Sequence, residues 1–128
     1  MTHSFLIFIR DKSGNKKISI IKTFIEIKSK PKKIHYFYKQ WDDSYNNLLN
    51  GGNDVSYYNN LTNDITTNVN VGEWIVFDNM FYDDDNKNII KKLISNKKLS
   101  IFVIVEDIQS NNKDIKKIMK KSNYMVIY

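Results

Sequence analysis

Apolar residues along the chain form short runs that alternate with segments in which apolar residues recur at helical spacing. The short runs predict five β-strands, at residues 4–10, 33–38, 73–77, 100–105 and 124–128. The segments between them predict helices at residues 18–28, 41–49, 89–94 and 115–119. Strands that alternate with helices are typical of a parallel sheet with helices on both faces. We therefore expect a three-layer α/β domain with a five-stranded, mostly parallel sheet.

The connecting segments are short or polar. The only proline, Pro31, marks a turn at residues 28–33, and Gly51-Gly52 ends the second predicted helix. Residues 53–70 are rich in Asn and Thr without a clear period, which predicts a loop with room for one short helix. Residues 82–88 are predicted to form an acidic loop. With 128 residues and no long linker, residues 1–128 are expected to form a single domain.

The composition excludes several classes of site. The chain has no cysteine, so disulfides and cysteine-based metal centres are excluded. His3 and His35 are the only histidines, too few for a zinc site without added carboxylates. The apolar run near the start has only strand length and meets Arg10 and Asp11, which argues against a signal peptide or a membrane span. We expect a protein that is not secreted and has no membrane partner.

A net charge of +6 favours acidic partners, nucleic acid above all. Two lysine clusters stand out in the second half of the chain. One comprises Lys91, Lys92, Lys97 and Lys98, and the other comprises Lys113, Lys116, Lys117, Lys120 and Lys121 on one predicted helix. Such lysines would bind phosphates without reading sequence. The alternative for these clusters is a solvated helix face. The high lysine content itself has another explanation, since only one of the 20 basic residues is arginine and the excess of Asn, Ile, Lys and Tyr is typical of the codon usage of an AT-rich genome.

In a parallel α/β sheet, ligands bind at the carboxyl ends of the strands. The loop after the first strand lies there and contains the degenerate phosphate-loop residues Ser13, Gly14, Asn15, Lys16 and Lys17. A phosphate-binding loop has the form G-x-x-x-x-G-K-[ST]. In this alignment Lys16 takes the place of the lysine, whereas both glycines and the hydroxyl residue are replaced. The alternative is an ordinary turn with solvated lysines.

The segment WIVFDNM predicts a buried strand that ends in Asp78 and Asn79, which is the form of a Walker B strand. Asp78 would be the ligand if Mg²⁺ is bound, whereas the amide of Asn79 has no basicity with which to activate water. Glu106 follows the next strand, at the sensor position. The alternative for each is a polar residue at a strand end. The consecutive acids Asp83 to Asp85 would suit a nuclease metal site, but such runs are usually solvated.

Taken together, these segments resemble the FtsK–HerA class of viral genome-packaging ATPases, in particular those of large DNA viruses and Polinton-like elements. The matching segments are SGNKK with an Ile-rich helix, IHYFYKQWDDSYNNLL, WIVFDNM, IIKKLISNKKLSIFVIVED and SNYMVIY. The resemblance covers nearly the whole chain and depends on the order and spacing of the segments. It implies a P-loop NTPase-like fold of the ASCE type.

Departures from the family pattern imply that hydrolysis is lost. The phosphate-loop glycines are missing, the acidic pair has become Asp78-Asn79, and the glutamine after the fourth strand is Glu106. Residues 95–98, where the arginine finger would lie, contain no arginine. A missing finger alone lowers turnover by orders of magnitude.

The resemblance therefore implies a catalytically inactive packaging-ATPase-like protein of a DNA virus or virus-derived element, acting as a structural or binding module. Its partner would be another copy, an active packaging ATPase, capsid protein or DNA, in the virion or in the host cytoplasm or nucleus. No cofactor is expected. Two alternatives stay open: a divergent NTPase for DNA packaging that uses ATP and Mg²⁺ with Lys16 or Lys17 and Asp78, and a non-specific nucleic-acid-binding protein. The aromatic residues from Tyr36 to Tyr45, and again at Tyr57-Tyr58, fit either an oligomer interface or the core.

Overall fold

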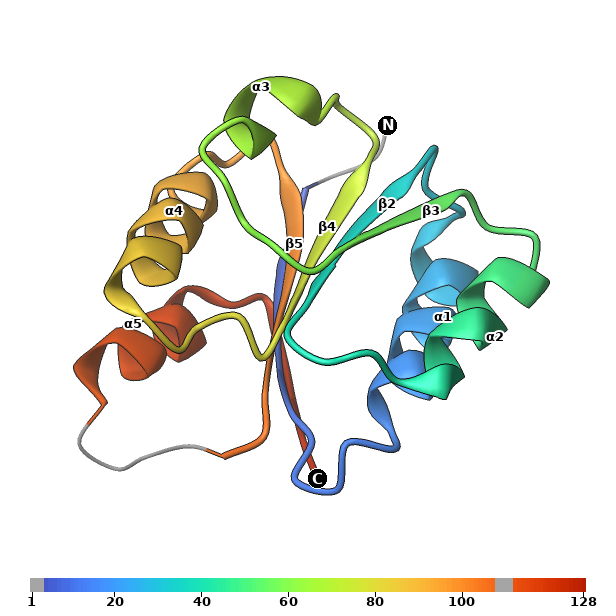
Figure 1. Cartoon of the computed structure of the whole chain (residues 1–128), viewed down its shortest axis with the longest axis horizontal. Helices are drawn as coiled ribbons and strands as arrows, with labels where there is room; N and C mark the ends of the chain where they lie inside the picture. Colours follow the sequence, from blue (N-terminus) through green and yellow to red (C-terminus); the bar gives the residue numbers. More distant parts are fainter. Residues whose placement is uncertain (1–3, 108–111) are drawn as a thin grey trace.

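The protein is a six-stranded sheet with helices on both faces (Figure 1). The structure, a computed structural model, describes residues 4–107 and 112–128. The strands are β1 (Leu6–Arg10), β2 (Ile34–Tyr38), β3 (Val55–Tyr58), β4 (Trp74–Asp78), β5 (Ser100–Val105) and β6 (Tyr124–Ile127). The α-helices are α1 (Lys17–Lys28), α2 (Asn46–Asn50), α3 (Ile65–Asn68), α4 (Asp84–Ile94) and α5 (Lys113–Lys121), and a 3-10 turn, η1 (Asp43–Tyr45), precedes α2.

The sheet has the order β3-β2-β4-β5-β1-β6, and all neighbouring strands are parallel. The predicted α/β fold with a parallel sheet is thus confirmed, but the prediction of five strands was wrong. The additional strand is β3, within the segment predicted to be a loop. It is only four residues long, pairs with β2 alone, and is partly exposed at the sheet edge. A strand of four residues between Asn-rich segments is too short to show the alternation of apolar and polar residues from which strands are predicted.

Two hydrophobic layers hold the helices to the sheet. The first layer lies between the sheet and α1 and α2, and contains Ile7, Val76 and Phe102. The second lies on the opposite face, under α3, α4 and α5, and contains Phe8 and Phe77. Consecutive residues of β1 and β4 thus contribute to opposite layers, as strand geometry requires. Because both faces are covered, these strands read as continuous apolar runs.

The acidic segment predicted to be a loop is largely helical. Asp83 caps α4, its side chain accepting a hydrogen bond from the Asn86 amide at 2.8 Å. Asp84 and Asp85 lie in the first turn, where negative charge interacts favourably with the helix dipole. The acidic run therefore has a structural explanation. Within the described residues no cluster of three or more metal-binding side chains is present.

The aromatic residues Tyr36 and Tyr45 belong to the core rather than to an exposed interface, since both are almost fully buried. Exposed apolar side chains gather instead on β6, at the open edge beyond β1. Tyr124, Met125 and Ile127 are each about half exposed there. No described helix is long and apolar enough to span a membrane.

Candidate functional site

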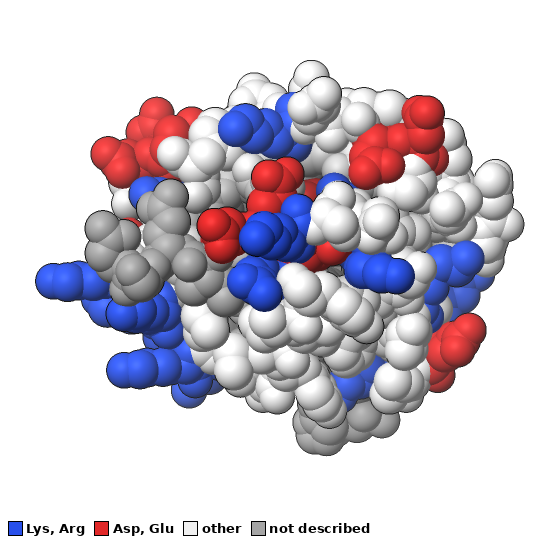
Figure 2. Space-filling model, turned by 90° about the horizontal axis from the view of Figure 1, so that it is seen from below, with Lys and Arg blue, Asp and Glu red and all other residues white. Residues whose placement is uncertain are grey.

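A cavity of about 820 Å³ opens at the carboxyl edge of the sheet. The segments that follow β1, β2, β4 and β5 line it, as expected for a parallel sheet. β2 leads to α2 on one face and β4 leads to α4 on the other, so the chain leaves these neighbouring strands in opposite directions (Figure 1). Such a divergence is the usual position of a ligand cleft. Figure 2 shows this edge, with carboxylates near its centre and lysines beside them.

The loop after β1 is organised around the carboxylate of Asp11, which is 1% exposed. One oxygen, Oδ2, accepts hydrogen bonds from the amides of Lys16 at 2.8 Å and Lys17 at 2.9 Å. The other, Oδ1, accepts a longer bond from the Gly14 amide at 3.2 Å. Gly14 has φ +76°, a left-handed conformation that costs little in glycine. Asp11 thus occupies the place before α1 where a phosphate loop would present its amides to a phosphate.

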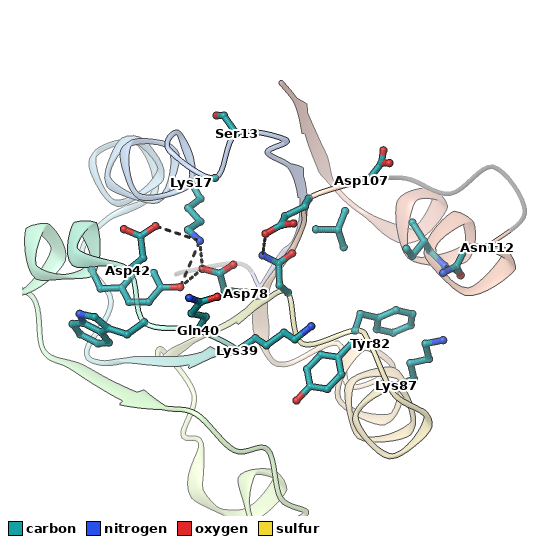
Figure 3. Close-up of a pocket in the computed structure, with 18 residues that line it drawn as sticks. Ser13, Lys17, Lys39, Gln40, Asp42, Asp78, Tyr82, Lys87, Asp107 and Asn112 are labelled. Atoms are coloured by element: carbon teal, nitrogen blue, oxygen red, sulfur yellow. Dashed lines mark hydrogen bonds and ion pairs between the residues drawn. The ribbon is translucent and has the colours of Figure 1, made fainter.

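The predicted phosphate-loop residues separate into two groups. Ser13, Asn15 and Lys16 are exposed, and Ser13 Oγ donates a hydrogen bond to Asn15 Oδ1 at 2.6 Å. Lys17 is instead 6% exposed and points into the cavity (Figure 3). The motif alignment had placed Lys16 in the lysine position. Helical spacing was the better signal, because Lys17 shares a face of α1 with the buried residues Ile21 and Phe24.

Lys17 is held by a buried ion pair with the strand-end carboxylate of β4. Its Nζ atom lies 2.8 Å from Asp78 Oδ2 and 3.9 Å from Asp42 Oδ2. The same Nζ is 3.5 Å from the Tyr45 hydroxyl and lies over the ring of that tyrosine. All three oxygen groups therefore surround one ammonium group (Figure 3).

Asp78 is also the acceptor for two tyrosines from different elements. The hydroxyls of Tyr36 on β2 and Tyr45 in η1 donate to Asp78 Oδ2 at 2.7 and 2.6 Å. Asp78 Oδ1 is buried without a hydrogen-bond partner. Burial, and then the charge of Asp78, raises the pKa of both tyrosines well above the ordinary value. The two hydroxyls therefore stay protonated and act as donors. The sequence placed Asp78 at this edge but gave no sign of either tyrosine.

Asn79, the predicted second Walker B position, turns away from this network. It has φ +56°, a left-handed conformation that asparagine tolerates better than most residues. Its Nδ2 atom donates a hydrogen bond to Glu106 Oε1 at 3.2 Å. The residues at the predicted Walker B and sensor positions are therefore hydrogen-bonded to each other. Glu106 is exposed and has the neutral amide of Asn79 beside it. Its carboxylate does not form an ion pair with Lys17, whose ion-pair partners are Asp42 and Asp78.

The outer wall of the cavity has aromatic side chains that the sequence did not suggest as site residues. Trp41 and Tyr82 are 43% and 48% exposed. Lys39 Nζ lies 4.7 Å from the centre of the Tyr82 ring, within cation–π range. Lys39 and Trp41 follow β2 and Tyr82 follows β4, the two neighbouring strands from which the chain continues to opposite faces of the sheet.

The remaining candidate residues lie away from the cavity. His35 is buried and its Nε2 atom lies 2.9 Å from Glu73 Oε1, near the amino end of β4. His3 lies outside the described residues. The predicted nucleic-acid-binding lysines Lys113, Lys116, Lys117, Lys120 and Lys121 are all exposed on α5.

The chain matches no protein-family model, and neither a curated protein nor a solved structure shows significant similarity to it.

Proposed function

We propose that this chain is a non-hydrolysing ATPase-like domain that works as a binding or structural module. The observation that supports this best is the position of Asp11. Its carboxylate already accepts hydrogen bonds from three amides, that of Gly14 in the loop and those of Lys16 and Lys17 at the start of α1. A bound phosphate would have to displace that carboxylate or lie beside it, and two anions in one amide cradle repel each other.

The second support is the ion pair between Lys17 and Asp78. In a P-loop enzyme the lysine binds the phosphates, and the carboxylate of the Walker B strand helps to hold Mg²⁺. Here the two groups satisfy each other at 2.8 Å, and Tyr36 and Tyr45 also donate to the same carboxylate. Binding of ATP or Mg²⁺ would require breaking this network. The residues present therefore do not fit a nucleotide with its metal ion.

The parallel sheet with helices on both faces is compatible with the P-loop NTPase-like fold that the family resemblance implies. The family resemblance suggests the context: a DNA virus or virus-derived element, with a second copy, an active packaging ATPase, capsid protein or DNA as partner. The arrangement of the site supports a module that keeps the fold and uses surfaces other than a nucleotide pocket.

Nucleotide binding tests this proposal directly. Thermal unfolding and titration calorimetry would be measured with ATP, ADP and GTP, each with and without Mg²⁺. We expect no change in melting temperature and no binding heat under any of these conditions. A ligand at 100 times its dissociation constant would add about 2.7 kcal/mol to the free energy of unfolding, a change that is easily measured in a domain of this size.

The contrary result would favour the divergent NTPase. It would be a Mg²⁺-dependent stabilisation by nucleotide that is retained in Lys16→Ala and lost in Lys17→Ala. Both variants remove one lysine from adjacent positions, but only Lys17 lines the cavity. Folding of each variant would be verified first by circular dichroism.

A further inference from the structure

Positive charge is concentrated in two segments, residues 91–98 and 113–121. Together they contain nine lysines and one acid, Asp114. The other 11 basic and 13 acidic residues give the rest of the chain a net charge of −2. A codon bias towards lysine would raise the basic content throughout the chain. It does not explain why the whole positive excess lies in two short segments.

The fold brings these two segments together. α4 and α5 lie side by side on the same face of the sheet (Figure 1). Lys91 Nζ on α4 lies 2.7 Å from Asp114 Oδ1 on α5. That hydrogen bond, with the charges of Lys87 and Lys117 nearby, lowers the pKa of Asp114. The single acid in the two segments is therefore already paired with a lysine.

The lysines continue to the far ends of both helices. There, Lys97 and Lys121 line one groove of about 560 Å³, together with Ser95, Asn96 and Asn123. We call the nine lysines of residues 91–98 and 113–121 the lysine face. Every one of them is exposed. Part of this group projects at the left of the molecule in Figure 2.

Helix stability explains only part of the lysine face. Lys91, Lys92, Lys120 and Lys121 lie in last turns, where a cation interacts favourably with the helix dipole. Lys113 begins α5, where the dipole disfavours a cation. The remaining lysines have no such role. Of these, Lys116 and Lys117 lie on α5, whereas Lys97 and Lys98 follow the end of α4, so helix stability does not account for a positive surface that spans both segments.

We propose that the lysine face binds the phosphate backbone of duplex nucleic acid without reading its sequence. Charge complementarity identifies a polyanion, and lysine contacts phosphates without the bidentate base recognition typical of arginine. Neither α4 nor α5 contains an aromatic residue, so they offer no platform on which single-stranded bases would stack. Neither helix exposes a large apolar side chain that would insert into a membrane. A duplex fits these conditions best.

This inference is independent of the nucleotide site, because the lysine face and the cavity beside Asp78 use different residues. Fluorescence anisotropy would measure the affinity of the whole chain for a short labelled DNA duplex of mixed sequence. We expect the same affinity for a second, unrelated sequence. We also expect the logarithm of the binding constant to fall linearly with the logarithm of salt concentration, by about 0.9 for each phosphate neutralised.

A matched pair of variants locates the surface. The first variant replaces Lys116, Lys117, Lys120 and Lys121 with Gln. The second replaces the exposed lysines Lys12, Lys22, Lys30 and Lys32, which lie outside the lysine face, with Gln. Both have the same net charge. If all four lysines of the first variant contact phosphates, its salt slope should fall by about 3.6, whereas that of the second should change little.

Several results would overturn the proposal. One is the absence of duplex binding at low salt, including the case in which anionic lipid vesicles bind and the duplex does not. A second is an equal loss of affinity in both variants, which would mean that only net charge matters. A third is tighter binding of a single strand than of the duplex. Circular dichroism and melting temperature of both variants would exclude unfolding as the cause.

Discussion

The ammonium group of Lys17 and the carboxylate of Asp78 form a 2.8 Å ion pair in which both side chains are almost completely buried. Lys17 begins α1 and Asp78 ends β4, 61 positions further along the sequence, and Tyr36 and Tyr45 donate hydrogen bonds to the same carboxylate from two further elements. Removing one partner of such a buried pair strongly lowers the stability of the fold, since it leaves an uncompensated charge in the interior.

The first prediction concerns this ion pair. Lys17→Met should lower the free energy of unfolding by about 3–5 kcal/mol, because the buried carboxyl group of Asp78 would lose its ion-pair partner. Lys16→Met, at an adjacent exposed position, should stay within about 0.5 kcal/mol of the wild type. Urea denaturation followed by circular dichroism would measure both. Equal effects of the two substitutions would contradict the assignment of Lys17 as the buried lysine.

A second prediction follows from the loop after β1. Asp11→Ala should destabilise the protein by about 1–3 kcal/mol, because amides at the start of α1 lose their common acceptor. Asp11→Asn should lose less, since its side-chain oxygen can still accept a hydrogen bond. Chemical denaturation of both variants gives the comparison, with Lys12→Ala as the exposed neighbouring control. An Asp11→Ala variant as stable as the control would be inconsistent with this capping role.

Tyrosine ionisation provides a third test. Burial raises the pKa of Tyr36, Tyr45 and Tyr57 above the ordinary value of 10.0. The folded state therefore holds these protons more tightly than the unfolded state. The resulting stability is present below the unfolded pKa near 10 and is lost as the pH rises from there towards the folded values.

Ultraviolet absorbance of tyrosinate during an alkaline titration should consequently show these three of the eight tyrosines ionising only when the protein unfolds. The triple substitution of these residues with Phe would remove the late step if the protein still folds. Ionisation of all eight tyrosines near pH 10, with the protein still folded, would refute the buried donor network.

The fourth prediction concerns the contact between Asn79 and Glu106, whose side chains meet at 3.2 Å. Asn79→Asp should not create hydrolysis. It should instead place two carboxylates together and destabilise the protein by about 1 kcal/mol at neutral pH. Adding Glu106→Gln should restore the stability, and its failure to do so would argue against direct repulsion. Phosphate release would measure the hydrolysis.

The sequence predicted most of the sheet because its inner strands are continuous apolar runs. It also placed Asp78, Asn79 and Glu106 at strand ends along one edge, which the fold confirms. It did not predict β3, whose four residues stand between polar segments. Nor did it predict the partners of Asp78, because a tyrosine in a strand and a tyrosine in a turn look like core residues until the strand order is known. The capping role of Asp11 depends on the path of the loop, which no local pattern specifies.

The strand order also has a consequence for how the chain folds. β1 is formed by residues 6–10, yet both of its neighbours come from the second half of the sequence: Leu6 pairs with Ile101, and Ile7 pairs with Tyr124. During synthesis the apolar strand β1 cannot pair with its neighbours in the sheet until β5 and β6 have left the ribosome. Contacts this distant in sequence slow folding and prolong the exposure of strand edges. The strand order thus leaves β1 without its sheet partners for most of the synthesis of the chain.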